Sequence, residues 1–219
     1  MLSVRPFIPI FLTVLAPFAD AAIIRYSLTE SGCTTGCSVL PAGTITVSTI
    51  TANEVFVSVQ LGSDYSFRKA NDANHWGLVF NLAGNPTITI TDVVSGDVTS
   101  QGWVLAQAGT FNAQPFGLFE YSLNCSTCNS GMAGVTTRSL SFRLLGPGLT
   151  ESSFIATNNI YFAVDVMGKT AAAGIGNTGS VGALRGITVV QTGVPEPGSP
   201  LLIISGVAVL GLGRLRRSR

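Results

Sequence analysis

Apolar and polar residues alternate along the middle of this chain in seven separate segments. They are residues 44–51, 54–61, 86–93, 116–123, 138–145, 160–167 and 186–190. A period of two residues is typical of β-strands that bury one face and expose the other. Gly, Asn, Asp, Ser and Pro gather between the segments, where they favour turns. The pattern therefore predicts many short antiparallel strands.

No part of this region has the 3.6-residue apolar spacing of an amphipathic helix. One short helical turn is expected over residues 149–156, with Thr150 able to cap it. Many short strands without long helices form two packed antiparallel sheets or a barrel. The sequence predicts an all-β fold over residues 22–192, an antiparallel β-sandwich of jelly-roll type with about eight strands.

Composition and charge narrow the class of protein. Charged residues make up 11% of the chain and hydrophobic residues 46%, which is too apolar for a disordered protein. Residues 23–197 hold seven Lys or Arg and ten Asp or Glu, a net charge of −3. A mildly acidic domain lacks the basic surface that nucleic acids require, so no nucleic-acid partner is expected.

The first segment, residues 1–21, has the features of a secretory signal peptide. Arg5 precedes an apolar stretch over residues 6–18, and the small residues Ala19 and Ala21 follow. Signal peptidase reads this small-x-small spacing, which predicts cleavage after Ala21. The alternative is a buried helix of the core.

The four cysteines form two close pairs, Cys33 with Cys37 and Cys125 with Cys128. Three disulfide pairings are possible for four cysteines. An exported chain enters an oxidising compartment, which favours disulfides within the two local pairs. Zinc binding by the four thiols is the alternative.

Residues 174–179 read G-x-G-x-x-G, as in a dinucleotide-binding loop. Such a loop follows a strand and opens a helix, and the flanking sequence predicts no helix. A surface loop whose glycines adopt positive φ angles is the preferred interpretation. His75 is the single histidine of the chain and is interpreted as a loop residue beside Trp76.

Acidic pairs offer oxygen ligands for calcium, but their spacing matches no known binding loop. The pairs are Asp64 with Asp72 and Asp92 with Asp97, and residues 92–97 are interpreted first as a hairpin turn. Threonines repeat on one side of the segments 44–51 and 87–91, a pattern that can match ice or a crystalline polysaccharide. Threonine is also a good strand former, and this simpler interpretation is preferred. We predict no catalytic residue, no metal site and no cofactor.

The C-terminal segment, residues 193–219, ends in an uncharged run over residues 201–213 and a cluster of arginines. A helix of 13 residues spans about 20 Å, short of the roughly 30 Å hydrocarbon core. Residues 198–200 and a snorkelling Arg214 bring it close to spanning, so a single transmembrane helix is predicted. The positive-inside rule makes the arginines a cytoplasmic stop signal. They are Arg214, Arg216, Arg217 and Arg219.

The motif before this run is Val194-Pro195-Glu196-Pro197. Together with the apolar run and the arginines, it resembles the PEP-CTERM sorting signal of Gram-negative bacteria. A tail of this kind is also named an ice-binding protein C-terminal domain, a label that does not show ice binding. The resemblance implies an inner-membrane precursor, recognition by an exosortase that removes the tail, and a cell that produces extracellular polysaccharide.

Residues 116–128, 140–166 and 176–183 are similar to mature domains often found upstream of this tail, a resemblance that implies no activity. We expect a non-enzymatic protein of the cell surface or extracellular matrix, associated with exopolysaccharide. The alternative is a secreted carbohydrate-binding module or hydrolase on a β-sandwich. A hydrolase requires two converging carboxylates, or His75 with a serine and an aspartate, whereas a binding module requires a row of exposed aromatic side chains.

Overall fold

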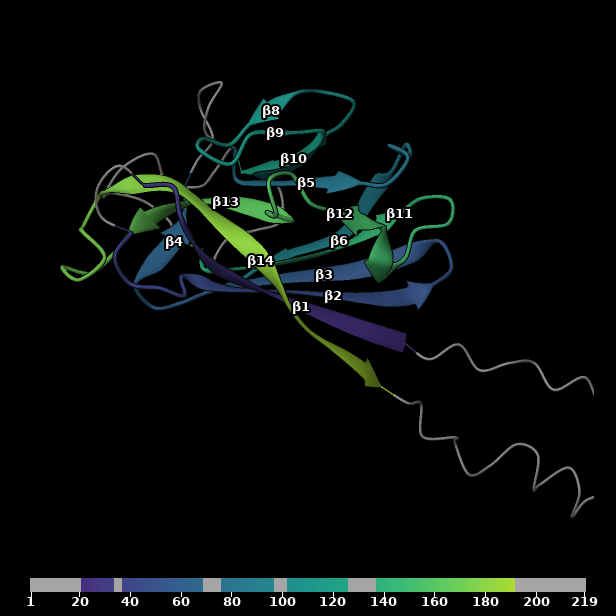
Figure 1. Cartoon of the computed structure of the whole chain (residues 1–219), viewed down its shortest axis with the longest axis horizontal. Helices are drawn as coiled ribbons and strands as arrows, with labels where there is room; N and C mark the ends of the chain where they lie inside the picture. The colour runs from purple at the N-terminus through teal and green to yellow at the C-terminus, as the bar shows by residue number, and fades with distance from the viewer. Residues whose placement is uncertain (1–20, 34–36, 69–75, 97–101, 126–136, 192–219) are drawn as a thin grey trace, which may run out of the picture. The chain divides into compact units, whose positions relative to one another are not determined.

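The computed structural model describes residues 21–33, 37–68, 76–96, 102–125 and 137–191. These residues belong to one compact unit, Ala21–Gln191. They form fourteen β-strands and a 3-10 turn, and no α-helix occurs among them (Figure 1). The predicted all-β class is confirmed.

Most strands join one antiparallel sheet. Its order is β6 (Thr89–Ser95), β11 (Ser139–Leu145), β3 (Glu54–Leu61), β2 (Gly43–Thr51), β1 (Ala21–Ser31), β14 (Thr178–Gln191), β13 (Phe162–Gly168), β5 (Leu78–Leu82), β10 (Tyr121–Cys125) and β7 (Trp103–Ala106). At its side, β4 (Tyr65–Phe67) pairs with β13, and β12 (Phe154–Ile155) pairs with β5. A separate hairpin contains β8 (Phe111–Asn112) and β9 (Leu118–Phe119).

The sheet curls until its two terminal strands, β6 and β7, approach each other. The side chain of Gln107 joins them, because its Oε1 accepts from the backbone N–H of Ile88 at 2.9 Å and its Nε2 donates to the Ile88 carbonyl at 3.1 Å. Beside β4, the backbone N–H of Phe67 donates to the Thr137 carbonyl at 2.9 Å. The result is a nearly closed, barrel-like sheet, so the division into two sheets of a sandwich is not confirmed.

The core fills the inside of the curled sheet. In β3, Val55, Val57 and Val59 point inward and are fully buried, as the alternation predicts. Aromatic rings fill the centre, where Phe80 stacks on Tyr121 with centroids 5.3 Å apart. The apolar face of each strand therefore has a common interior to bury against.

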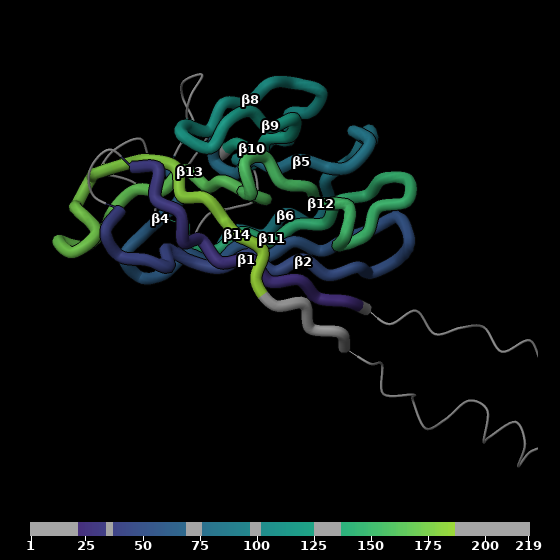
Figure 2. Tube along the Cα trace, in the orientation of Figure 1, coloured from purple at the N-terminus to yellow at the C-terminus, as the bar shows by residue number. Residues whose placement is uncertain are grey.

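A second, smaller apolar cluster lies on the outer side of β5 and β13. Val79 and Ala163 point away from the main core and pack beneath the hairpin residues Phe111 and Phe119. Figure 2 shows β8 and β9 beside β5 and β10. The hairpin covers these strands, so β5 is buried along its whole length.

The strands that the sequence predicts best are those with one exposed face. The segments 44–51, 54–61 and 138–145 correspond to β2, β3 and β11. The prediction missed β5, whose residues Leu78–Leu82 are all buried and show no alternation. It also missed β1, which begins at Ala21, within the predicted signal segment.

Two turns have the predicted geometry. Gly174 and Gly176 have φ angles of 72° and 76°, the left-handed values expected for a glycine-rich loop. Strand β14 follows this loop where a dinucleotide site requires a helix, so the dinucleotide alternative is wrong. A 3-10 turn, η2 (Glu151–Ser153), begins after Thr150, whose backbone N–H donates to Ser153 Oγ at 3.0 Å.

The predicted signal peptide, apart from Ala21, and the predicted transmembrane helix lie outside the described residues. Within the described part of the chain, no helix is long and apolar enough to cross a membrane.

Replacing Tyr26 with phenylalanine is expected to remove a stability loss between pH 10 and 12. Burial raises the pKa of Tyr26 from 10 to about 12, and the positive charge of Arg185, which lowers the pKa, offsets only part of this effect. Folding therefore opposes ionisation of the phenol, so the free energy of unfolding is unaffected below pH 10 and falls by at most about 2–3 kcal/mol as pH rises through 12. Urea unfolding at pH 9 and pH 12, followed by circular dichroism, measures the difference between the two proteins.

At neutral pH the same replacement should leave the free energy of unfolding unchanged or raise it by about 1 kcal/mol. The Tyr26 hydroxyl is buried and has no hydrogen-bond partner in the described structure. Burial also raises the pKa of Tyr65 and Tyr121, so both proteins should lose some stability in alkali. Equal losses in the two proteins would contradict the prediction.

Candidate functional site

One predicted disulfide is present. Cys33 and Cys37 are bonded, with their Cα atoms 5.6 Å apart. Cys37 is buried in the main core, and Cys33 packs against it. The bond therefore fastens the segment after β1 to the interior.

Most other predicted site residues lie outside the part of the chain that the structure describes. Ala21 begins β1 and Cys125 ends β10, but only their backbones are described. The remainder are Ala19, Cys128, Val194, Pro195, Glu196, Pro197, Arg214, Arg216, Arg217 and Arg219, and with them His75, Asp72 and Asp97. The second disulfide and the sorting motif therefore stay predictions.

Two of the acidic residues considered for calcium, Asp64 and Asp92, have structural partners instead. Asp64 accepts a hydrogen bond from Thr170 Oγ1 at 2.5 Å. Asp92 lies in β6, so the turn predicted over residues 92–97 does not begin there, and its Oδ2 is 3.1 Å from Arg143 Nε. No group of three or more potential metal-ligating side chains occurs among the described residues.

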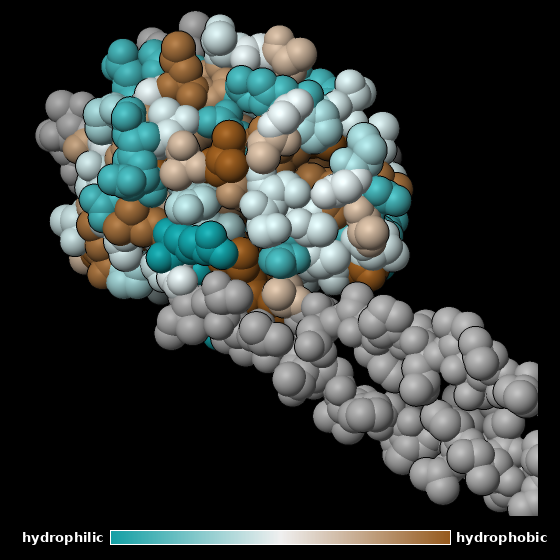
Figure 3. Space-filling view, turned by 45° about the vertical axis from the view of Figure 1, so that its right-hand side comes forward, coloured by the Kyte–Doolittle hydropathy of each residue, from teal (hydrophilic) through white to brown (hydrophobic). Residues whose placement is uncertain are grey.

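The aromatic side chains do not form an exposed row in the described structure. Trp103 is 7% exposed and packs edge-on against Phe67, with ring centroids 5.2 Å apart. Trp76 is half-buried against Phe111, at a centroid distance of 4.7 Å. On the face drawn in Figure 3, apolar side chains appear as separate patches among hydrophilic and intermediate ones. The surface formed by the described residues shows no aromatic platform of the kind expected of a typical carbohydrate-binding module.

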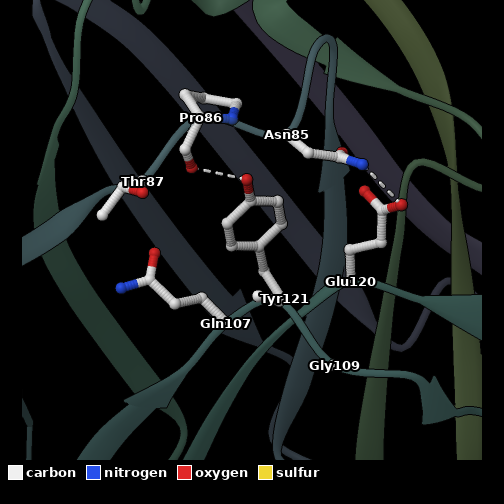
Figure 4. Close-up of a pocket in the computed structure, with 8 residues that line it drawn as sticks. Asn85, Pro86, Thr87, Gln107, Gly109, Glu120 and Tyr121 are labelled. Atoms are coloured by element: carbon white, nitrogen blue, oxygen red, sulfur yellow. Dashed lines mark hydrogen bonds between the residues drawn. The ribbon is translucent and has the colours of Figure 1, made fainter.

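A pocket of about 380 Å³ opens where the segments after β5 and β7 meet the start of β10. Its lining consists of Asn85, Pro86, Thr87, Gln107, Ala108, Gly109, Glu120 and Tyr121 (Figure 4). These residues come from the segment after β5, the segment after β7 and the start of β10. Asn85 and Ala108 have positive φ angles of 48° and 57°, which turn the chain sharply at both rims.

Glu120 is the one carboxylate in the lining. Its Oε1 accepts a hydrogen bond from Asn85 Nδ2 at 2.8 Å, and its backbone N–H donates to Asn81 Oδ1 at 2.7 Å (Figure 4 shows the first bond). The first bond orients the carboxylate, and the second holds the backbone at Glu120. Its second carboxylate oxygen has no hydrogen-bond partner in the described part of the chain.

Hydrogen bonds from Tyr121 and Gln107 connect the segments around the pocket. The Tyr121 hydroxyl donates to the Pro86 carbonyl at 2.6 Å, which ties the loop after β5 to β10. Burial, and then the charge of Glu120, raises the pKa of Tyr121, so the phenol stays protonated as a donor. Gln107 holds the opposite rim through its two bonds to Ile88.

This arrangement suits binding of a small polar molecule better than hydrolysis of a glycosidic bond. Glycosidases of the usual kind place two carboxylic acids across the scissile bond. The lining of this pocket has one, Glu120. A carboxylate, the Asn85 amide and the Thr87 hydroxyl together can bind hydroxyl or amine groups.

Sequence reasoning did not identify Glu120, Asn85 or Gln107. The alternation at residues 116–123 indicates only that Glu120 faces away from the core, and residues 82–86 have the composition of an ordinary turn. Their meeting depends on the pairing of β5 with β10, which no local pattern encodes. Comparisons of the chain with protein-family models, curated proteins and solved structures found no match.

Proposed function

We propose that this chain is an exported protein of the cell surface or extracellular matrix, delivered through its C-terminal segment. In this proposal residues 1–21 are a signal peptide and residues 193–219 a PEP-CTERM sorting signal. The transmembrane helix holds the precursor in the inner membrane until an exosortase removes the tail. The folded domain then associates with extracellular polysaccharide and has no catalytic role.

The pairing of the first and last strands is the observation that carries this proposal. Ala21 lies opposite Gln191 and Ala22 opposite Val190, so both ends of the folded unit leave from one place. Ala21 is the last residue of the predicted signal peptide. Val194 follows Gln191 by three residues, at most about 11 Å of extended chain. The folded unit therefore fits between the two predicted processing sites.

The residues after β14 support processing at this end. Pairing with β1 occupies the backbone as far as Gln191. Proline has no backbone N–H, so Pro195 and Pro197 cannot extend that ladder or form a helix interior. A transpeptidase that binds an extended backbone would therefore find its target sequence directly after the folded unit.

Replacing Pro195, Glu196 and Pro197 with alanine is expected to block processing. The variant should accumulate in the inner membrane as a precursor larger by the mass of the tail, because the exosortase loses its motif while the apolar run and arginines persist. Immunoblots of fractionated cells measure this. Alanine at Thr192, outside the proposed sorting signal, is the control and should be processed normally.

Wild-type processing and delivery of the triple variant would show that the motif is only a linker, and the sorting proposal would fail. A mature N-terminus at Ala22, read by mass spectrometry of the exported protein, tests the signal peptide in the same cells.

A second candidate function is a carbohydrate-binding module on a jelly-roll-like β-sandwich. The pocket at Glu120 supports it, since hydroxyl-rich ligands bind through such carboxylate, amide and hydroxyl groups. The variant Glu120→Gln removes the charge of the carboxylate, so a loss of polysaccharide binding in this variant would assign the binding to the pocket.

A further inference from the structure

The outer face of four adjacent strands carries a set of small hydroxyl side chains. Alternate residues of β1, β2, β3 and β11 point into the core, and the residues between them face outward. We use the term hydroxyl face for Ser27, Thr44, Thr46, Ser58, Ser139 and Ser141, together with the amide of Gln60.

Strand register arranges these side chains in two rows. Ser27 lies opposite Thr44, Thr44 opposite Gln60, and Gln60 opposite Ser139. In the second row, Thr46 lies opposite Ser58, and Ser58 opposite Ser141. Strands are about 4.8 Å apart and same-side residues about 6.8 Å apart, so the rows form a regular grid.

The hydroxyl groups of the grid are available to a ligand. None of the six has a hydrogen-bond partner among the described side chains and backbone. Thr44 and Gln60 are exposed, and the remaining side chains are half-buried. A hydroxyl both donates and accepts, so the grid can match another hydroxyl-rich surface without a fixed polarity.

The grid contains no charged residue. Arg25 borders its second row opposite Thr46. On the other side, Arg143 is neutralised by Glu54 at 2.6 Å and Asp92 at 3.1 Å. An anionic polymer would require a cluster of unpaired Lys or Arg. The charge pattern therefore matches an uncharged ligand.

The hydroxyl face has too few large side chains to suit a protein partner. Protein interfaces are anchored by large aromatic or arginine side chains in their centre. Here Phe56 lies in the next row, opposite Ser48 and Arg143, and is half-buried. One aromatic side chain at the border of a hydroxyl grid can contact the apolar side of a sugar ring while the hydroxyls bind its edge.

We propose that the hydroxyl face binds an extended, uncharged polysaccharide. This inference rests on the proposed association with extracellular polysaccharide, for which it names the surface and the class of polymer. Thr46 and Ser58, side by side at the centre of the four strands, make the contacts that removal of hydroxyls should weaken most.

The test is cosedimentation of the exported, processed protein with insoluble neutral glucans, cellulose and a β-1,3-glucan, and gel retardation by the anionic polymer alginate. The variant Thr46→Val with Ser58→Ala removes two central hydroxyls and keeps side-chain volume nearly constant. Its matched control, Ser63→Ala with Thr110→Val, makes the same chemical changes at exposed positions away from the grid.

We expect the wild type and the control to bind at least one neutral glucan, and the grid variant to bind it at least tenfold more weakly. Equal binding by all three, loss of binding in Glu120→Gln, or retention by alginate alone would overturn the inference. Inhibition of ice growth without polysaccharide binding would overturn it as well. A wild type that is correctly processed but binds no neutral glucan refutes this inference and leaves the sorting proposal intact.

Discussion

Replacing Asp165 with alanine is expected to lower the free energy of unfolding by about 3–5 kcal/mol. Asp165 lies in β13 and is fully buried. Its Oδ2 is 3.6 Å from Nη1 of Arg68, whose side chain is 19% exposed. Removing the carboxylate leaves a mostly buried guanidinium without its counter-charge, and that cost is large in an apolar interior.

Arg68 depends on this carboxylate. Its Nε and Nη1 atoms are buried without a hydrogen-bond partner in the described structure. Its backbone N–H donates to the Asp165 carbonyl at 3.1 Å, which holds the end of β4 beside β13. The ion pair and the backbone hydrogen bond between Arg68 and Asp165 therefore both stabilise the contact between β4 and β13.

Urea unfolding followed by tryptophan fluorescence measures this effect. Asp92→Asn is the control, because Asp92 also pairs with an arginine, its side chain is 67% exposed, and asparagine tolerates its positive φ of 52°. Exposed ion pairs contribute about 0–1 kcal/mol, so the control should unfold almost like the wild type. If Asp165→Ala also stays within about 1 kcal/mol of the wild type, the buried pair does not support the fold.

The sequence predicts strands best where one face is buried and the other meets water. β2, β3 and β11 follow this rule, and their periodicity is visible without the fold. β5 is covered on both sides by the core and by the β8–β9 hairpin, so its alternation is lost. The curl that brings β6 to β7 depends on Gln107 and Ile88, which no periodic pattern identifies.

Candidate sites were harder to predict because their parts meet only through strand register. The threonines of β2 are recognisable as a ladder in the sequence. Their neighbours Ser58 and Ser141 come from segments far apart along the chain and align only when β3 pairs with both β2 and β11. The pocket at Glu120 has the same origin, since it forms between loops that follow different strands.

Replacing Phe162 with alanine is expected to destabilise the fold by about 3–5 kcal/mol. Phe162 is fully buried at the start of β13, where it faces Ala183 of β14 and Phe80 of β5. Its ring centroid lies 4.9 Å from that of Tyr26 and 5.0 Å from that of Phe154. Alanine would leave a cavity where these strands meet.

The conservative variant Phe162→Leu should cost less than about 1.5 kcal/mol, because most of the buried volume is kept. Calorimetric melting of both variants measures the difference. A small loss in Phe162→Ala would mean that the surrounding rings collapse into the space. A large loss in both would instead identify the aromatic edge contact with Tyr26, rather than the filled volume, as the stabilising feature. Because β14 pairs with β13 and β1, the alanine variant should also loosen the strand that precedes the proposed sorting motif. Protease sensitivity near Gln191 should then rise in parallel with the loss of stability.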